Sequence, residues 1–234
     1  MKKILYIAMA VLLCSSCFRV NLTPRDHSAS RVGLSQIKGE GPVISRNLEL
    51  SDFDAIQVIG QADILFAQAD TFNVTLRTQE NIFDYVDFKV KGTTLVIETK
   101  NHRSINAEEY TLTLSAPELK GIDIAGAARF EIADGLVSDE DLDISVAGAG
   151  QLNLTGLQVN SLDVDIAGAA KADLSGIRVK SLDVDIAGTG KINISGEAED
   201  ATMDIAGVGS IDARNLKISN PMQKHVSGIG KIRI

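Results

Sequence analysis

The chain has 234 residues, of which 44% are hydrophobic and only 4% aromatic, with no tryptophan. This length suits one or two domains. The formal net charge of −8 argues against a nucleic-acid partner, because phosphate binding needs clustered lysine and arginine. It also argues against electrostatic binding to anionic lipid.

The first segment, residues 1–16, has the features of a secretory signal peptide. It starts with two lysines and continues with an apolar run, ending at Leu13, that is too short to span a bilayer. The sequence LCSSC at its end resembles a bacterial lipobox, with two small serines directly before Cys17. We therefore predict that residues 1–16 are a lipoprotein signal peptide and that Cys17 is the lipid attachment site. The alternative is an ordinary signal peptide with incidental cysteines.

Residues 17–45 are predicted to be the lipidated cysteine and a flexible tether. This segment is polar, contains prolines and glycines, and shows no sustained alternation. Processing at Cys17 removes Cys14, which leaves no free thiol for a disulfide, a metal site or thiol catalysis. These features predict a protein anchored by lipid in the cell envelope of a Gram-negative bacterium, at its outer membrane. The sequence leaves open whether it faces the periplasm or the cell surface.

A less regular β region is predicted over residues 46–118. Its alternating segments are FDAIQVIGQADILFAQ, FNVTLRT, VDFKVKGTTLVIET and YTLTLSAP. Within it, KGTT is predicted to be a tight turn between two strands. Residues 78–86 are predicted to form a short helical turn, capped by Thr78 or Asn81.

A regular repeat is predicted over residues 119–234. Six glycine corners recur at spacings of 22, 20, 20, 19 and 21 residues: Gly126, Gly148, Gly168, Gly188, Gly207 and Gly228. Apolar residues stand two before and four after most of these glycines, and polar residues stand three before and three after, which predicts half-buried strands. Gly60 carries the same pattern about three periods earlier. The predicted fold is therefore all-β: a right-handed parallel β-helix, or β-solenoid, with coils of about 20 residues.

The order of these segments resembles a known family. The stretches FDAIQVIGQADILF and YTLTLSAPELKGIDIAGAARFEI, followed by repeated DIAG corners, are similar to the auto-transporter adhesin head domain, or GIN domain, of bacterial envelope proteins. The resemblance covers about residues 48–234. It implies a parallel β-helix-like fold and an adhesive role, and it carries no catalytic residues. Alanine replaces the family's first corner serine in five of the six copies, which keeps the corner small but removes hydroxyls.

Stacked aspartates are the most serious candidate for a site. They form two predicted columns: Asp163 and Asp183 in one, and Asp165, Asp185 and Asp204 in the next. Stacked carboxylates repel unless they are paired or bridged by a cation, and calcium accepts such oxygens. The alternative is that Arg129, Lys171 and Lys191, across the corner, supply the opposite charge, helped by solvent screening. We predict the second case, with no metal and no cofactor bound.

No catalytic arrangement is evident in the sequence. The three histidines, His27, His102 and His225, are far apart in the chain, and the glycine corners precede strands rather than the helix that a phosphate loop needs. We predict a non-enzymatic envelope lipoprotein that binds a protein or glycan partner or spaces components of the envelope. The alternative is a carbohydrate-binding or carbohydrate-processing β-helix protein. A groove lined with exposed aromatic residues, first of all Tyr85 and Tyr110, would favour that alternative.

Overall fold

The structure, a computed structural model, describes residues 36–234, so the predicted signal peptide, Cys17 and most of the predicted tether lie outside the described residues. The described part is all-β with short 3-10 segments, and none of its helices is long and apolar enough to cross a bilayer. Its elements are β1 (Ile37–Lys38), β2 (Val43–Asn47), β3 (Ala55–Gln68), β4 (Asn73–Gln79), η2 (Glu80–Tyr85), β5 (Val86–Lys91), β6 (Thr94–Thr99), η3 (Lys100–His102), β7 (Ile105–Asn106), β8 (Tyr110–Ala116), β9 (Gly121–Ile132), β10 (Leu136–Val137), β11 (Leu142–Thr155), β12 (Leu157–Ile218) and β13 (Gln223–Arg233).

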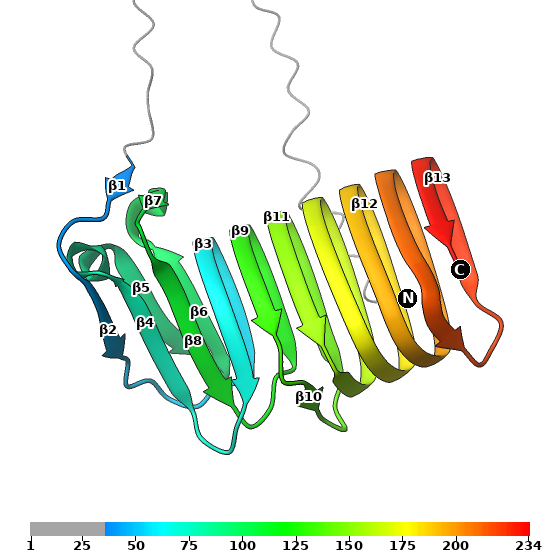
Figure 1. The fold of residues 1–234 in the computed structure, drawn as a ribbon, viewed down its shortest axis with the longest axis horizontal. Coiled ribbons are helices and arrows are strands. Elements are labelled where there is room, and N and C mark those ends of the chain that lie inside the picture. The colour runs from blue at the N-terminus through cyan, green and yellow to red at the C-terminus, as the bar shows by residue number, and fades with distance from the viewer. Residues whose placement is uncertain (1–35) are drawn as a thin grey trace, which may run out of the picture. The chain divides into compact units, whose positions relative to one another are not determined.

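A parallel stack forms the larger part of one 11-stranded sheet. Strands β3, β9, β11, β12 and β13 pair in parallel, each with the next. The register places the corner glycines opposite one another: Gly60 pairs with Gly126, Gly126 with Gly148, Gly148 with Gly168, and Gly207 with Gly228. Figure 1 shows the ribbons of this stack side by side, with β12 winding back on itself several times. The alignment of corners predicted from the sequence is therefore confirmed.

Backbone geometry requires glycine at each corner. The seven corner glycines have φ between +117° and +150°, a region that is open to residues with a side chain only at high cost. A Cβ atom on Gly168 would collide with the carbonyl oxygen of Gly148, and one on Gly188 would collide with that of Gly168. The corners can stack at strand spacing because none of these glycines has a side chain.

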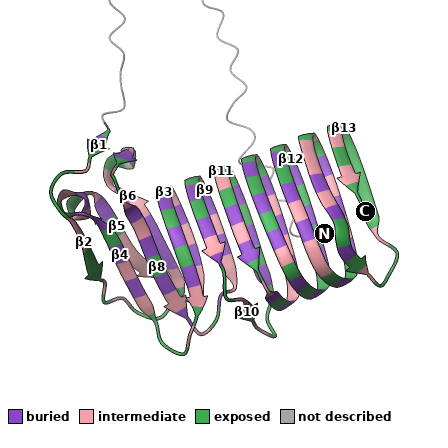
Figure 2. Ribbon diagram, viewed as in Figure 1, coloured by how far each residue is buried: buried purple, intermediate pink, exposed green. Residues whose placement is uncertain are grey.

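Side chains along the stack alternate between the core and solvent, as the period of two predicts. Ile166 and Ile186 are each 2% exposed, whereas Asp185, the residue directly before Ile186, is exposed. Figure 2 shows the alternation along each ribbon. One continuous core runs from the irregular region into the repeat, where Phe66 of β3 stacks on Phe130 of β9 at a ring separation of 6.5 Å. The core is therefore not interrupted at the predicted boundary near residue 119.

The ordered fold starts earlier than the sequence suggested. β1 pairs in parallel with β7, and β2 pairs antiparallel with β4, although both lie wholly or partly within the range predicted to be tether. Ile37 is buried at 4% exposure. Residues 36–45 thus belong to the folded part, and their strands are too short to show the sustained alternation on which the prediction relied.

The irregular end of the sheet contains the predicted hairpin and helical turn. β5 and β6 pair antiparallel around Gly92, and η2 occupies the predicted helical turn. The predicted caps are wrong, because η2 has no side-chain cap. Instead, the Thr78 hydroxyl donates to the carbonyl oxygen of Glu109 at 2.7 Å, and the Asn81 amide donates to that of Lys38 at 2.8 Å. Both side chains join distant segments, which local sequence does not reveal.

Candidate functional site

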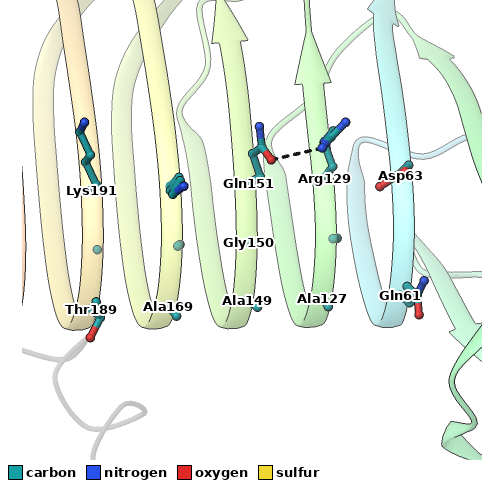
Figure 3. A pocket seen from close by; sticks show the side chains of 14 residues that line it. Gln61, Asp63, Ala127, Arg129, Ala149, Gly150, Gln151, Ala169, Thr189 and Lys191 are labelled. Atoms are coloured by element: carbon teal, nitrogen blue, oxygen red, sulfur yellow. Dashed lines mark hydrogen bonds between the residues drawn. The ribbon is translucent and has the colours of Figure 1, made fainter.

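A shallow groove follows the corners of the parallel stack, with a volume of about 620 Å³. We call it the corner groove. Its floor consists of exposed residues that directly follow the corner glycines. Four of them are small, Ala127, Ala149, Ala169 and Thr189, and the fifth is Gln61 at the end next to the irregular region. A polar row borders the floor, formed by the residues three positions after the corner glycines: Asp63, Arg129, Gln151, Lys171 and Lys191. Figure 3 shows the labelled members of this row in one line beside the corners.

Small residues also occupy the position two after each corner glycine of the groove, because the core packing there excludes larger side chains. A Cβ atom on Gly150 would lie 2.8 Å from Cγ1 of Val146, and one on Gly190 would lie 2.9 Å from Cγ2 of Ile186. The equivalent positions Ala128 and Ala170 are buried. Small residues at this position therefore let the chain turn tightly over the core, and the small exposed residues of the floor leave the channel open outside it.

Within residues 36–234, the basic residues of the polar row form no ion pair, although Asp63 in the same row is the register partner of Arg129 and Asp173 borders a hollow with Lys171 and Lys191. Arg129 donates to the neutral Oε1 of Gln151 at 3.4 Å, the one hydrogen bond within the row. In the described part of the chain, Lys171 and Lys191 make no hydrogen bond and no ion pair. By contrast, Lys217 pairs with Glu197 at 3.4 Å on another part of the surface. The row thus holds cationic groups free to meet an external anion.

Aspartates gather on the strand segments that precede the corners. Register pairs Asp143 with Asp163 and Ser145 with Asp165. Burial and then the neighbouring carboxylates, Asp183 first among them, raise the pKa of Asp185 to about 6, and the pKa of Asp165 is raised for the same two reasons.

The sequence suggested that basic residues across the corner neutralise these aspartates. Within residues 36–234, no ion pair joins Asp165, Asp185 or Asp204 to the polar row, so this pairing is wrong. The physical reason is that the two columns lie on opposite sides of the corner, six residues apart along the chain. Residues 36–234, which the structure describes, contain no group of three or more acidic, histidine or cysteine side chains placed to hold a metal ion.

The sequence matches the family described as "Putative auto-transporter adhesin, head GIN domain" over residues 52–178 and 171–234. The chain belongs to this family. The match spans the parallel stack and all of its irregular end except β1 and β2, and it includes every residue of the corner groove. A comparison with curated proteins finds no match to the chain.

Solved structures share the fold of this GIN domain. A "putative adhesin" from Parabacteroides distasonis is 25% identical, with a TM-score of 0.75, and the alignment covers 85% of this chain and 84% of that one. A "putative lipid binding protein" from the same species is 23% identical, with a TM-score of 0.73, covering 85% and 99%. A "putative adhesin" from Bacteroides fragilis is also 23% identical, with a TM-score of 0.66, covering 84% and 99%.

The tyrosines suggested as a sugar-binding platform are not exposed in the GIN domain. Tyr110 is buried at 8% exposure, its hydroxyl has no hydrogen-bond partner, and burial raises its pKa. Tyr85 is half-buried, with the guanidinium of Arg103 5.6 Å from the centre of its ring. His225 lies exposed on β13, away from the groove, and Cys17 and His27 lie outside the described residues.

The aspartate columns predict how stability depends on pH. Because folding raises the pKa of Asp185 to about 6, the folded state binds protons more tightly than the unfolded chain, whose aspartates titrate near about 4. The contribution of Asp185 to the free energy of unfolding should therefore rise as the pH falls from about 7 towards about 4. Because Asp185 is partly exposed, this group should contribute no more than about 1 kcal/mol.

Melting curves of Asp185→Asn test this dependence. The variant should melt at a higher temperature than the wild type near neutral pH and should respond less to acid. Asp173→Asn is the matched control, because Asp173 is exposed and its register partner is the neutral Asn153. The same dependence of melting temperature on pH in the wild type and in Asp185→Asn would contradict the assignment.

Proposed function

We propose that this protein is a non-enzymatic lipoprotein of the cell envelope whose GIN domain binds an extended partner along the corner groove. The observation that carries the proposal is the polar row, with its unpaired Lys171 and Lys191, set along an open channel on a rigid stack. The family description of an adhesin head supports a binding role. A groove that repeats with each corner suits a ligand that itself extends along the stack.

The proposal includes the architecture of that stack. We take it to be a right-handed β-solenoid with coils of about 20 residues, because Leu142 pairs in parallel with Leu162 and parallel crossovers are almost always right-handed. The regular coils cover residues 119–234, and residues 46–118 form the irregular β region that covers one end. Such an elongated scaffold holds the groove at a fixed shape, which lowers the entropy lost on binding.

The proposal also places the protein at the outer membrane of a Gram-negative bacterium, anchored by lipid on Cys17. Residues 1–16 are then the signal peptide, and residues 17–35 connect the lipid to the folded domain. The basis is the sequence LCSSC after an apolar run.

Replacing Cys17 with alanine should abolish palmitate labelling and release the protein from the outer-membrane fraction. Cys14→Ala is the matched control and should leave both unchanged, because Cys14 follows Leu13, a poor residue at a cleavage point. Metabolic labelling and membrane fractionation measure the two effects. Unchanged labelling in Cys17→Ala would disprove the anchor.

Site-specific photocrosslinking in intact cells tests the binding function. A photoreactive residue at position 149, in the groove floor, should give species of higher mass in the envelope. The control is position 145, on the same strand β11 and equally exposed, but on the acidic side of the corner. Equal crosslinking at both positions, or none at position 149, would contradict a ligand in the groove.

A further inference from the structure

The members of the polar row are spaced like the strands of the sheet. Register pairs Arg129 with Gln151 and Gln151 with Lys171, and Lys191 continues the row in the same groove (Figure 3). Neighbouring strands lie about 4.8 Å apart, so the row from Arg129 to Lys191 is about 14 Å long. It offers three cations and one amide in line, with one polar group on each coil.

Charge and hydrogen-bonding capacity bear on which anionic polymer such a row would suit. An extended peptide directs side chains to one face at every second residue, about 6.6 Å apart, which falls out of step with the coils. Each sugar of an extended polyuronate carries one carboxylate, and although successive carboxylates turn about the chain axis, each sugar also presents hydroxyl groups that an acidic peptide backbone lacks. A bilayer presents anionic groups over a broad plane, which would also approach the aspartates on the other side of the corner.

The groove floor favours the same ligand. Ala127, Ala149 and Ala169 have no atom beyond Cβ, so a polymer backbone can lie close to the protein along the groove. The amide of Gln151 and the hydroxyl of Thr189 provide hydrogen-bonding groups for sugar hydroxyls. Asp63 ends the cationic run on one side and repels a carboxylate placed on the next coil.

Building on the proposed function, we infer that the corner groove binds an extended acidic polysaccharide whose uronate carboxylates meet Arg129, Lys171 and Lys191. The net charge of −8 opposes a polyanion over long distances. At physiological ionic strength, however, screening limits that repulsion to about 8 Å, so the nearest cations decide the contact. Binding should consequently be modest in affinity and weaken as salt is added.

Polygalacturonate is the probe for this inference, titrated into the full chain in a neutral detergent. The double variant Lys171→Gln/Lys191→Gln should weaken binding about tenfold. The matched control Lys217→Gln/Lys224→Gln removes the same charge from exposed lysines outside the groove and should change affinity less than about threefold. Asp63→Asn should strengthen binding, since it removes the repelling carboxylate. Neutral dextran should not bind.

A steric variant separates a ligand seated in the groove from general charge attraction. Ala149→Leu fills the floor without changing any charge and should weaken polygalacturonate binding, whereas Ser145→Leu on the same strand should not. Melting temperatures verify that each variant is folded. The polysaccharide assignment would be overturned by equal losses of polygalacturonate affinity in the two double lysine variants or by no binding at low salt. Tighter binding of polyglutamate or of phosphatidylglycerol vesicles would also overturn it. Crosslinking at position 149 would still distinguish that result from a failure of the binding function itself.

Discussion

Replacing Gly188 with alanine is expected to lower the free energy of unfolding by about 3 kcal/mol or more. Gly188 has φ of +142°, and a Cβ there would collide with the carbonyl oxygen of Gly168 on the neighbouring coil. That oxygen is part of rigid backbone, so the clash can be relieved only by separating the two coils. Denaturant unfolding of the purified protein measures the loss.

The matched control for this substitution is Ala187→Ser. It alters the adjacent, exposed residue and restores the serine usual at this point of the family's corner. Its effect should stay within about 0.5 kcal/mol. If Gly188→Ala unfolded at the wild-type midpoint, the stacked corner geometry would be wrong.

Truncating Ile186 to alanine should cost about 2–5 kcal/mol, because the side chain is 2% exposed within the continuous core and its loss leaves a cavity between coils. Asp185→Ala, one residue away, should cause no loss near neutral pH. Its carboxylate is exposed and is repelled by Asp183, Asp165 and Asp204. The two midpoints in the same denaturant series measure the difference. Similar losses in both variants would contradict the alternation of core and solvent positions.

Much of the fold could be predicted because the repeat places the same physical requirement at the same point of each coil. Gly148, Gly168 and Gly188 stand in one column since each stacks directly on the last, and Ile166 and Ile186 do so since each fills the same layer of core. The short elements at the N-terminal end were not predicted from the sequence. β1 and β2 have two and five residues, and the roles of Thr78 and Asn81 depend on segments distant in the chain.

The candidate site was predicted less well from the sequence than the fold was. The columns of Lys171 and Lys191 and of the aspartates were visible, but the sequence suggested that they neutralise one another. The structure shows that a corner separates them, so that one side collects carboxylates with raised pKa and the other collects unpaired cations. The groove itself follows from small exposed residues at successive corners, such as Ala149 and Ala169, and Gly150 and Gly190 let those corners pack tightly over Val146 and Ile186.

Lysine reactivity in intact cells tests the central claim most directly, because it asks whether the corner groove is occupied in the envelope. Acylation of the cells, followed by peptide mass spectrometry, compares each lysine with the same residue in the purified full chain. We expect Lys171 and Lys191 to lose reactivity in the envelope, while Lys217 and Lys224, exposed outside the groove, keep it. Undiminished reactivity of Lys171 and Lys191 in cells would contradict the proposal that this groove binds the partner.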